Sequence, residues 1–257
     1  MRILTSLGVI AAAVTTLSSA SSITITTTTA KSPSPAFGAD GSFNPCRAIS
    51  MDDQVALDEC YMQLALDHVM IHNPSFPFGA LIVDHTTNEI SCYGANSNRK
   101  NKLLHGETTA FWNCTELYPS PTHDDLNDPG LNWSHQTLYT TGEPCPACAS
   151  QSIYRGVGRV VWGSSIPDIN RSGRQQLMID MDDVIISAHM GGYQIDHRVP
   201  DVVGGVLQDK CDHAFWCAFS IYRDDAYYQS MLARDLGDYI EDHKRRFPCV
   251  TVPFVIH

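Results

Sequence analysis

The chain has 257 residues and a formal net charge of −11, from 28 acidic and 17 basic side chains. Apart from a short run at residues 244–246, lysine and arginine are scattered, whereas proteins that bind nucleic acid gather cations against the phosphates. The charge balance therefore argues against a tRNA or DNA substrate and favours a small, neutral one. The length suits one globular domain with extensions at its ends.

Residues 1–20 are typical of a secretory signal peptide. Arg2 precedes an apolar run at residues 3–17, and the small residues 18–20 form a cleavage site. A membrane anchor is the alternative, but Thr and Ser interrupt the run, which is shorter than the roughly 20 residues of a spanning helix. We therefore expect a secreted, extracellular protein that has no membrane partner after signal cleavage.

The segments on either side of the expected domain differ from it in composition. Residues 21–49 form a low-complexity leader, because their Thr-, Ser- and Pro-rich part offers too few large apolar side chains for a core. The domain is predicted at residues 50–222, and residues 223–257 form a C-terminal extension that we expect to be helical. Three sequons make the chain a candidate glycoprotein: Asn132 and Asn170 in predicted loops, and Asn113 in a predicted helix.

The hydrophobic pattern predicts alternating strands and helices, which is typical of an α/β protein. In chain order we expect a helix at 50–71 with a capping box at Ser50 and Asp53, strands at 78–83 and 89–93, a helix at 104–117, a strand at 137–141, a helix at 145–155 and a strand at 159–163. Less regular patterns follow at 175–181, 184–186 and 203–207, and helices are expected at 210–222 and 225–246. The polar loop at 119–136 is long enough to be an insertion or an active-site lid.

Nine cysteines in a secreted chain suggest disulfides. Two of them belong to the motif described next, so seven remain and at least one stays free or pairs between chains. Those within apolar segments are expected to be small buried hydrophobes, namely Cys60, Cys92 and Cys114. The better candidates for bridges are Cys46, Cys211, Cys217 and Cys249.

One constellation of residues predicts chemistry. His105-Gly106-Glu107 and the later segment 144–148, Pro-Cys-Pro-Ala-Cys, match H-x-E…P-C-x-x-C, the signature of zinc-dependent nucleobase deaminases. The thiolates of Cys145 and Cys148 and the imidazole of His105 would hold Zn²⁺ and leave its fourth position open to water, as catalytic sites do. The two cysteines are three residues apart at a helix start, so their side chains lie on one face of the helix. The helix dipole at this end favours the thiolate form.

Glu107 is the predicted catalytic residue. Residues two apart on a regular helix point away from each other, so His105 and Glu107 converge only if His105 lies at the irregular helix start. Glu107 would then take a proton from a water held by the zinc and deliver protons to the ring nitrogen and the departing ammonia. Two alternatives stay open, which are a dithiol redox pair at Cys145 and Cys148 and a zinc protein without catalysis.

With these residues the chain resembles the cytidine deaminase-like superfamily over about residues 50–222, in its guanine, cytosine and nucleoside deaminase branch. The resemblance implies a three-layer α/β/α cytidine deaminase-like fold, with a mixed five-stranded sheet flanked by helices, and a homodimer. Residues 137–141, with Asn113 and Cys114, are similar to fungal cytosine deaminases. Residues 77–80 and 204–207 are more similar to the group of guanine deaminases and general nucleoside deaminases.

The same resemblance implies contacts with the substrate. Asn96, with Asn98 as the alternate, corresponds to the asparagine that hydrogen-bonds the base, although either could be an ordinary turn residue. Gly106 and Glu143 correspond to residues that line the pocket. Three aromatic residues could stack on a base or pack in the core: Phe76, Phe215 and Trp216.

The sequence therefore predicts a secreted zinc hydrolase that deaminates a free nucleobase or nucleoside, with guanine ahead of cytosine. An RNA adenosine deaminase shares the signature, but it requires a basic groove that the acidic composition does not favour.

Overall fold

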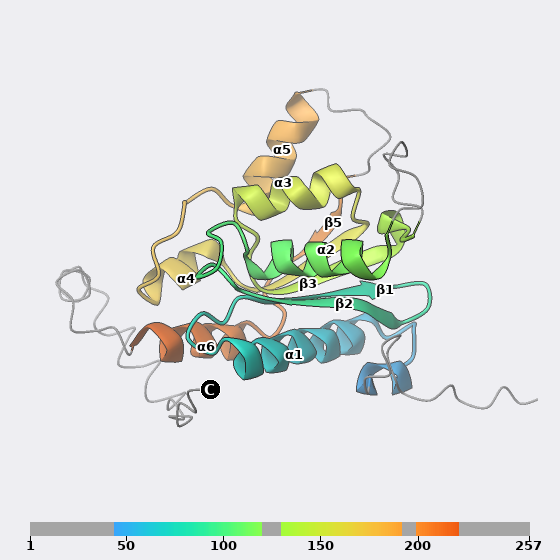
Figure 1. Cartoon of the computed structure of the whole chain (residues 1–257), viewed down its shortest axis with the longest axis horizontal. Coiled ribbons are helices and arrows are strands. Elements are labelled where there is room, and N and C mark those ends of the chain that lie inside the picture. The colour runs from blue at the N-terminus through green and yellow to red at the C-terminus, as the bar shows by residue number, and fades with distance from the viewer. Residues whose placement is uncertain (1–43, 120–129, 192–198, 221–257) are drawn as a thin grey trace, which may run out of the picture. The chain divides into compact units, whose positions relative to one another are not determined.

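In the residues that the structure describes, five strands pair into one mixed sheet with the order β2-β1-β3-β4-β5 (Figure 1). The structure is a computed structural model and describes residues 44–119, 130–191 and 199–220. The strands are β1 (Gly79–Asp84), β2 (Glu89–Ala95), β3 (Gln136–Gly142), β4 (Arg159–Ser164) and β5 (Asp201–Val203). β1 pairs antiparallel with β2 and β3, whereas β4 pairs parallel with β3 and β5.

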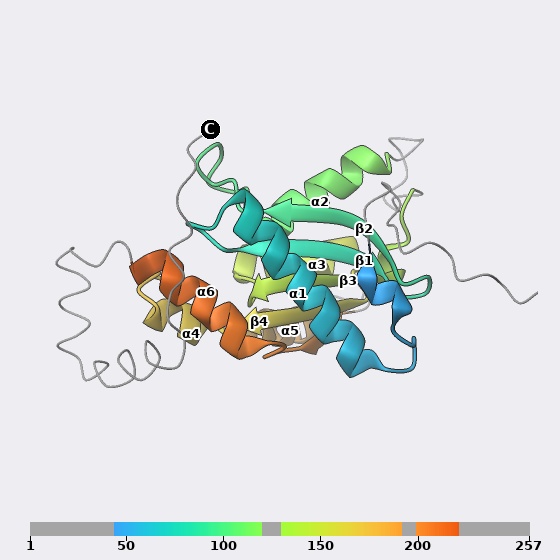
Figure 2. The same ribbon diagram turned by 90° about the horizontal axis from the view of Figure 1, so that it is seen from below.

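Helices cover both faces of this sheet. On one face lie α1 (Gln54–His72) and α6 (Gln208–Ser220), which stand in front of the strands in Figure 2. On the other lie α2 (Gly106–Leu117), α3 (Pro146–Arg155) and α5 (Met181–Met190) (Figure 1). The short elements are η1 (Pro45–Ala48), η2 (Trp133–His135) and α4 (Ile166–Arg171). The arrangement confirms the predicted three-layer α/β/α fold.

The core consists of two apolar layers, one on each side of the sheet. Successive strand side chains point to opposite faces, so Ala80 and Ile82 of β1 pack with Phe111 of α2, while Leu81 and Val83 pack with the α1 side. All four β1 side chains are almost completely buried. Each large apolar side chain removed from water in this way contributes about 1.5–3 kcal/mol to folding, which fixes the strand register that places the site.

The first helix begins three residues later than the predicted capping box. The N-cap is Asp53, whose side chain accepts a hydrogen bond from the backbone N–H of Ala56. The Ser50 hydroxyl instead accepts from Asp52, in the turn before the helix, so Ser50 is not the cap. The helix ends at His72, one residue beyond the predicted end, with Asn73 as its C-cap.

Two disulfides contradict the expectation for Cys60, Cys92 and Cys114. Cys46 of η1 pairs with Cys60 of α1, with Cα atoms 5.8 Å apart, and Cys92 of β2 pairs with Cys114 of α2, with Cα atoms 5.4 Å apart. Cys46, Cys92 and Cys114 are buried and Cys60 is half-buried, and each faces another cysteine across two packed elements. Cys211, expected to form a bridge, is free and buried, because it lies against Gly163 of β4. Cys217 is disulfide-bonded, and Cys249 lies outside the described residues.

Several boundaries also differ from the predictions. Asn44 and Cys46, in the segment assigned to the leader, are fully buried in the fold. α4 was not predicted, and the apolar residues 177–179 precede α5 without joining a helix. The signal segment, most of the leader and the predicted helix at 225–246 lie outside the described residues. Among the helices of the described ranges, none is both long and apolar enough to cross a membrane.

Candidate metal centre

His105 and Cys145 each stand immediately before a helix. His105 is the N-cap of α2, with φ −70° and ψ 169°, and Cys145 is the N-cap of α3, with φ −61° and ψ 164°. N-cap side chains usually accept a hydrogen bond from their own helix, but neither of these two does so. Both side chains instead turn toward each other. His105 therefore lies at the irregular helix start that the convergence with Glu107 requires.

Cys148, one turn into α3, completes the group. The Nδ1 atom of His105 lies 3.5 Å from the Sγ of Cys145 and 3.6 Å from the Sγ of Cys148, and the three ligand atoms lie within 4.8 Å of one another. A tetrahedral zinc with Zn–S and Zn–N bonds of about 2.3 Å and 2.05 Å separates nitrogen from sulfur by about 3.6 Å. The observed distances match that geometry, so the donor set fits a zinc ion.

The protonation of the sulfurs also suits a cation. A hydrogen bond from the Cys148 thiol lowers the pKa of Cys145 to about 4, and His105 adds to the effect. The same hydrogen bond and burial raise the pKa of Cys148, because its proton is held between the two sulfurs. The hydrogen bond to Cys145 raises the pKa of His105. One thiolate is thus present already, and a bound metal would displace the second proton.

Glu107, the second residue of α2, is 4% exposed. Burial raises the pKa of Glu107 to about 7, and the negative charge of Cys145 acts in the same direction. A carboxyl group with a pKa near neutrality can both accept and release a proton under ordinary conditions, which is what a general acid and base requires.

Two glycines allow the start of α2 to approach the strands. A Cβ atom on Gly106 would lie 2.5 Å from the carbonyl oxygen of Phe78, and one on Gly94 would lie 2.2 Å from the carbonyl oxygen of Gly106. Any side chain at either position would push α2 away from β1 and β2. The glycine between His105 and Glu107 therefore sets the position of both side chains.

A hydroxyl and an amide support Cys148. The Oγ1 of Thr108 lies 3.9 Å from the Sγ of Cys148, and the same oxygen accepts a hydrogen bond of 3.0 Å from the Nε2 of Gln151. Because Gln151 supplies the donor, the Thr108 hydrogen is left to point at the sulfur. A sequence search for metal ligands alone does not find these two positions. The sequence feature that indicates Gln151 is its position three residues after Cys148, which places both side chains on the same face of α3.

Known proteins share this sequence pattern. Residues 55–164 match the family described as the cytidine and deoxycytidylate deaminase zinc-binding region. Residues 55–164 therefore carry the zinc-binding region that is typical of the cytidine deaminase-like superfamily. It is 24% identical over 163 residues to a tRNA-specific adenosine deaminase of Haemophilus influenzae, covering 63% of this chain and 82% of that protein. It is 28% identical over 148 residues to a probable cytosine deaminase of Schizosaccharomyces pombe, covering 54% of this chain and 79% of that protein.

A solved structure agrees with the superfamily fold. A crystal structure of a mutant of the protein NE0047, in complex with 8-azaguanine, superposes with a TM-score of 0.51 at 20% identity. The match covers 64% of this chain and 85% of that one. The superfamily carries zinc, and the cluster of His105, Cys145 and Cys148 is where this chain can hold it.

Asn96, the residue expected to hydrogen-bond the base, is held in place by backbone and side-chain hydrogen bonds. Asn96 is 5% exposed and follows β2; its N–H donates to the Phe78 carbonyl, and its Oδ1 accepts from the N–H of Asn98. The Asn73 amide donates to the Asn96 carbonyl. Asn96 is therefore fixed beside Phe78, whose carbonyl also touches Gly106, while Asn98 acts as its hydrogen-bond donor.

Glu143 follows β3, and backbone N–H groups hold its carboxylate. One carboxylate oxygen accepts from the N–H of Ile166 at 2.8 Å and the other from the N–H of Met181 at 2.9 Å. Both donors are the first residues of helices, α4 and α5. The carboxylate of Glu143 thus joins two helix N-termini, where negative charge is favourable.

Of the three aromatic residues that could stack on a base, two lie in the core and one is half-buried. Phe215 and Trp216 are buried, and Phe215 packs with its ring centroid 4.7 Å from that of Phe78. Phe76 is half-buried and contacts Phe219 edge-on. Phe76 is therefore the one of the three that remains available to a ligand.

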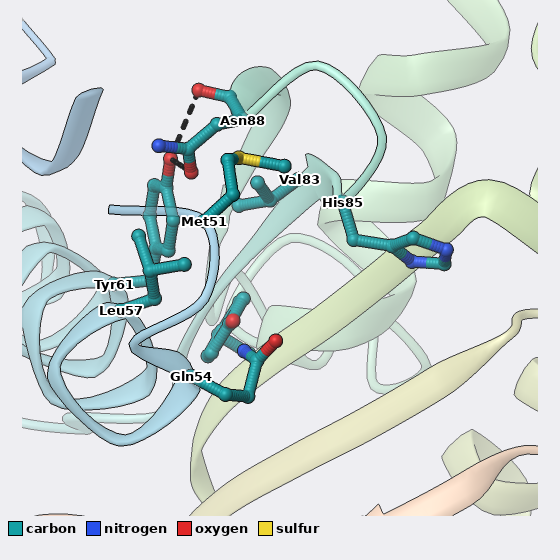
Figure 3. A pocket seen from close by; sticks show the side chains of 8 residues that line it. Met51, Gln54, Leu57, Tyr61, Val83, His85 and Asn88 are labelled. Carbon is teal, nitrogen blue, oxygen red and sulfur yellow. Dashed lines mark hydrogen bonds between the residues drawn. The ribbon is translucent and has the colours of Figure 1, made fainter. Parts of the chain in front are cut away.

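A pocket near the start of α1 is separate from the metal centre (Figure 3). Eight residues line it, and none is a metal ligand: Met51, Gln54, Leu57, Tyr61, Val83, His85, Asn88 and Tyr139. The Tyr61 hydroxyl donates to Asn88, as the dashed lines of Figure 3 show, and burial raises the pKa of Tyr61 to about 12. Both tyrosine hydroxyls of this pocket, those of Tyr61 and Tyr139, already donate hydrogen bonds within the protein. The metal centre is therefore the better candidate for a catalytic site.

Proposed function

We propose that this chain is a secreted, zinc-dependent hydrolytic deaminase of a free nucleobase or nucleoside, with guanine preferred to cytosine. The observation that carries the proposal is the placement of the buried, protonatable Glu107 two residues from His105, at the donor set that fits zinc. The match of residues 55–164 to a deaminase zinc-binding region supports a hydrolase of C–N bonds, and the substrate is our proposal.

The roles of the residues follow from their positions. His105, Cys145 and Cys148 would hold the zinc, which when bound polarises water and lowers its pKa. Glu107 takes the proton of the water that adds to the amidine carbon and passes protons to the ring nitrogen and to the leaving amino group. The C–N bond breaks, ammonia leaves, and the carbon keeps the water oxygen as a carbonyl. Asn96 would hydrogen-bond the base, and Gly106 would line the pocket through its backbone.

Several observations support a small extracellular substrate. The named relatives include a probable cytosine deaminase, and the structural neighbour was solved with 8-azaguanine, a purine-base analogue. The two disulfides favour an oxidising compartment, in agreement with the signal-like residues 1–20. The net charge of −11 opposes binding of a polyanion such as tRNA.

We also propose a homodimer. The outer surfaces of the helices α2, α3 and α5 carry large apolar side chains, including Trp112, Tyr154 and Met190, which are 63%, 68% and 84% exposed. A layer with this much exposed apolar surface favours association. Light scattering of the purified protein tests this part, and a monomeric mass at micromolar concentration would contradict it.

The experiment that tests the activity measures ammonia release by the zinc-loaded protein with guanine, cytosine, adenine and their nucleosides. We expect turnover of one base or nucleoside and a loss of about 10²–10⁴-fold in Glu107→Gln, because general acid–base catalysis contributes that much. The variant should keep its zinc, since Glu107 is not a ligand. Ammonia release at an equal rate by the variant would contradict the role of Glu107.

A further inference from the structure

Arg174 lies between α4 and α5, after the turn at Gly173, whose φ is +103°. Its guanidinium carbon stands 5.2 Å from the centroid of the Phe76 ring, and both side chains are half-buried. The segment is held by hydrogen bonds, because Asn170 Oδ1 accepts from the Gln176 N–H and the Gln176 side chain donates to the Arg174 carbonyl. The arginine therefore has a defined position over an aromatic face.

This guanidinium has no acidic partner in residues 44–119, 130–191 and 199–220. Ion pairs in the same ranges do satisfy three other arginines: Arg47, Arg159 and Arg171. A half-buried guanidinium offers five N–H donors, and leaving them unused is unfavourable. In a chain with 28 acidic residues, an arginine without a carboxylate is an available recognition group.

Arg174 is also close to the metal centre. Phe76 precedes Phe78 by two residues, and the Phe78 carbonyl accepts from Asn96 and touches Gly106. α4, which leads to Arg174, lies at the same end of the sheet as the loop between β2 and α2 (Figure 1). The hydrogen bond to Cys145 raises the pKa of His105, and the positive charge of Arg174 opposes that rise.

We propose that Arg174, held against Phe76, is a specificity-determining residue that binds the O6/N7 edge of a guanine base. This inference rests on the proposed deamination at the metal centre. Guanine loses the amino group on C2, and O6 and N7 lie across the ring from C2, so a base with C2 at Glu107 directs that edge away from the zinc ligands. Two adjacent acceptors match the parallel N–H groups of a guanidinium.

Cytosine offers no such edge. With C4 at the centre, its opposite side presents N1–H flanked by O2 and C6–H, so a guanidinium finds one acceptor, O2, beside a donor instead of two adjacent acceptors. Arg174 therefore supplies a physical reason for a preference for guanine, because an arginine facing cytosine can pair with one acceptor and not with two.

The experiment compares Arg174→Met, which keeps the apolar stem over Phe76, and Arg174→Lys, which keeps the charge without the paired donors. In Arg174→Met we expect kcat/KM for guanine to fall about 10- to 100-fold, mostly through KM, with cytosine nearly unchanged. Arg174→Lys should recover only part of the loss. Arg155→Met is the matched control, because Arg155 also stands over aromatic rings, those of Phe111 and Trp133, and should leave the guanine-to-cytosine ratio unchanged.

Binding of 8-azaguanine, which retains the O6/N7 edge, tests Arg174 separately from turnover. If the unmutated protein releases no ammonia but binds 8-azaguanine, and Arg174→Met weakens that binding at least tenfold, the proposed reaction fails and the role of Arg174 stands. An equal loss for guanine and cytosine in Arg174→Met would overturn the inference. So would no binding of 8-azaguanine by the unmutated protein, or a loss confined to nucleoside monophosphates, which would assign Arg174 to a phosphate.

Discussion

The polar side chains around Asp58 and those around His105 are both largely buried, but they differ in how they are satisfied. Asp58 of α1 accepts two hydrogen bonds from the Arg159 guanidinium, at 2.7 and 2.6 Å, one from the Tyr139 hydroxyl and one from Gln54. The carboxylate has its cation and its donors within the protein. At the metal centre, in contrast, one ligand atom each of His105, Cys145 and Cys148 lie within 4.8 Å of one another, which suits a cation from outside the protein.

The difference shows which buried polar groups are candidates for chemistry. Burial and hydrogen bonding alone describe both groups, and both are costly to desolvate. Only the group around His105 has ligand atoms spaced for a shared ion and a neighbouring carboxyl group, Glu107, whose pKa is raised to about 7 by burial. The group around Asp58 stabilises the fold, because it joins α1, β3 and β4.

Removing a ligand should have the largest effect. In Cys145→Ala we expect the zinc affinity to fall by more than about 100-fold, since loss of even a supporting residue typically costs 10–100-fold. Deamination should fall to background. Metal analysis of the dialysed protein measures the first effect, and ammonia release measures the second. Stoichiometric zinc in the dialysed variant would show that the three residues are not the ligand set.

Disrupting the hydrogen bonds around Asp58 should lower the stability of the fold and leave zinc binding intact. Asp58→Ala leaves the Arg159 guanidinium without its carboxylate, and we expect the free energy of unfolding to fall by about 3–5 kcal/mol. Urea titration followed by circular dichroism measures the loss. The folded fraction should keep one zinc per chain. A loss of zinc without a loss of stability would contradict the separation of the two groups.

Thr108 tests whether the support of Cys148 matters to the metal. Thr108→Val removes the hydroxyl that faces the sulfur and keeps the side-chain volume, so we expect a zinc affinity about 10-fold lower. Competition with a chelator measures the affinity. Thr115→Val on the same helix is the control, because the Thr115 hydroxyl bonds to the Phe111 carbonyl, away from the sulfurs. Equal affinities in both variants would remove Thr108 from the site.

His68 of α1 gives the smallest effect, which depends on pH. Burial, with a further contribution from His72, lowers the pKa of His68 to about 4. Below about pH 6.5 the unfolded chain binds a proton that the folded chain rejects, so stability is complete above that pH and decreases as pH falls toward 4. After discounting for partial exposure, we expect about 1 kcal/mol. Urea titrations at pH 7 and pH 5 should show a smaller decrease in His68→Asn than in the unmutated protein.

The fold and the metal ligands could be predicted because their signals are local. The H-x-E and P-C-x-x-C motifs stand at helix starts, and the strands β1 and β2 are short apolar runs around a turn. α4 also carries a local signal, because Ser165 caps the helix by accepting from the Asp168 N–H, and Pro167 lies in its first turn.

Other features depend on contacts between distant residues, which spacing does not reveal. The role of the Glu143 carboxylate is one of these, because it joins Ile166 and Met181, 23 and 38 residues further along the chain. Cys92 and Cys114 look like ordinary core residues until β2 and α2 are packed together. Arg174 had no sequence signal, because an unpaired cation is recognised only when its neighbours are known.

The disulfide between Cys92 and Cys114 has a consequence for assembly of the site. The bond joins residues 22 apart, and Asn96, His105 and Glu107 all lie between them. Half of the site is therefore part of a covalent ring. A ring of this size restricts the unfolded chain by about 3 kcal/mol, so the oxidised chain searches fewer conformations before the histidine meets the two cysteines of α3. A chain made in a reducing compartment loses that restriction and must form the same centre from an open segment.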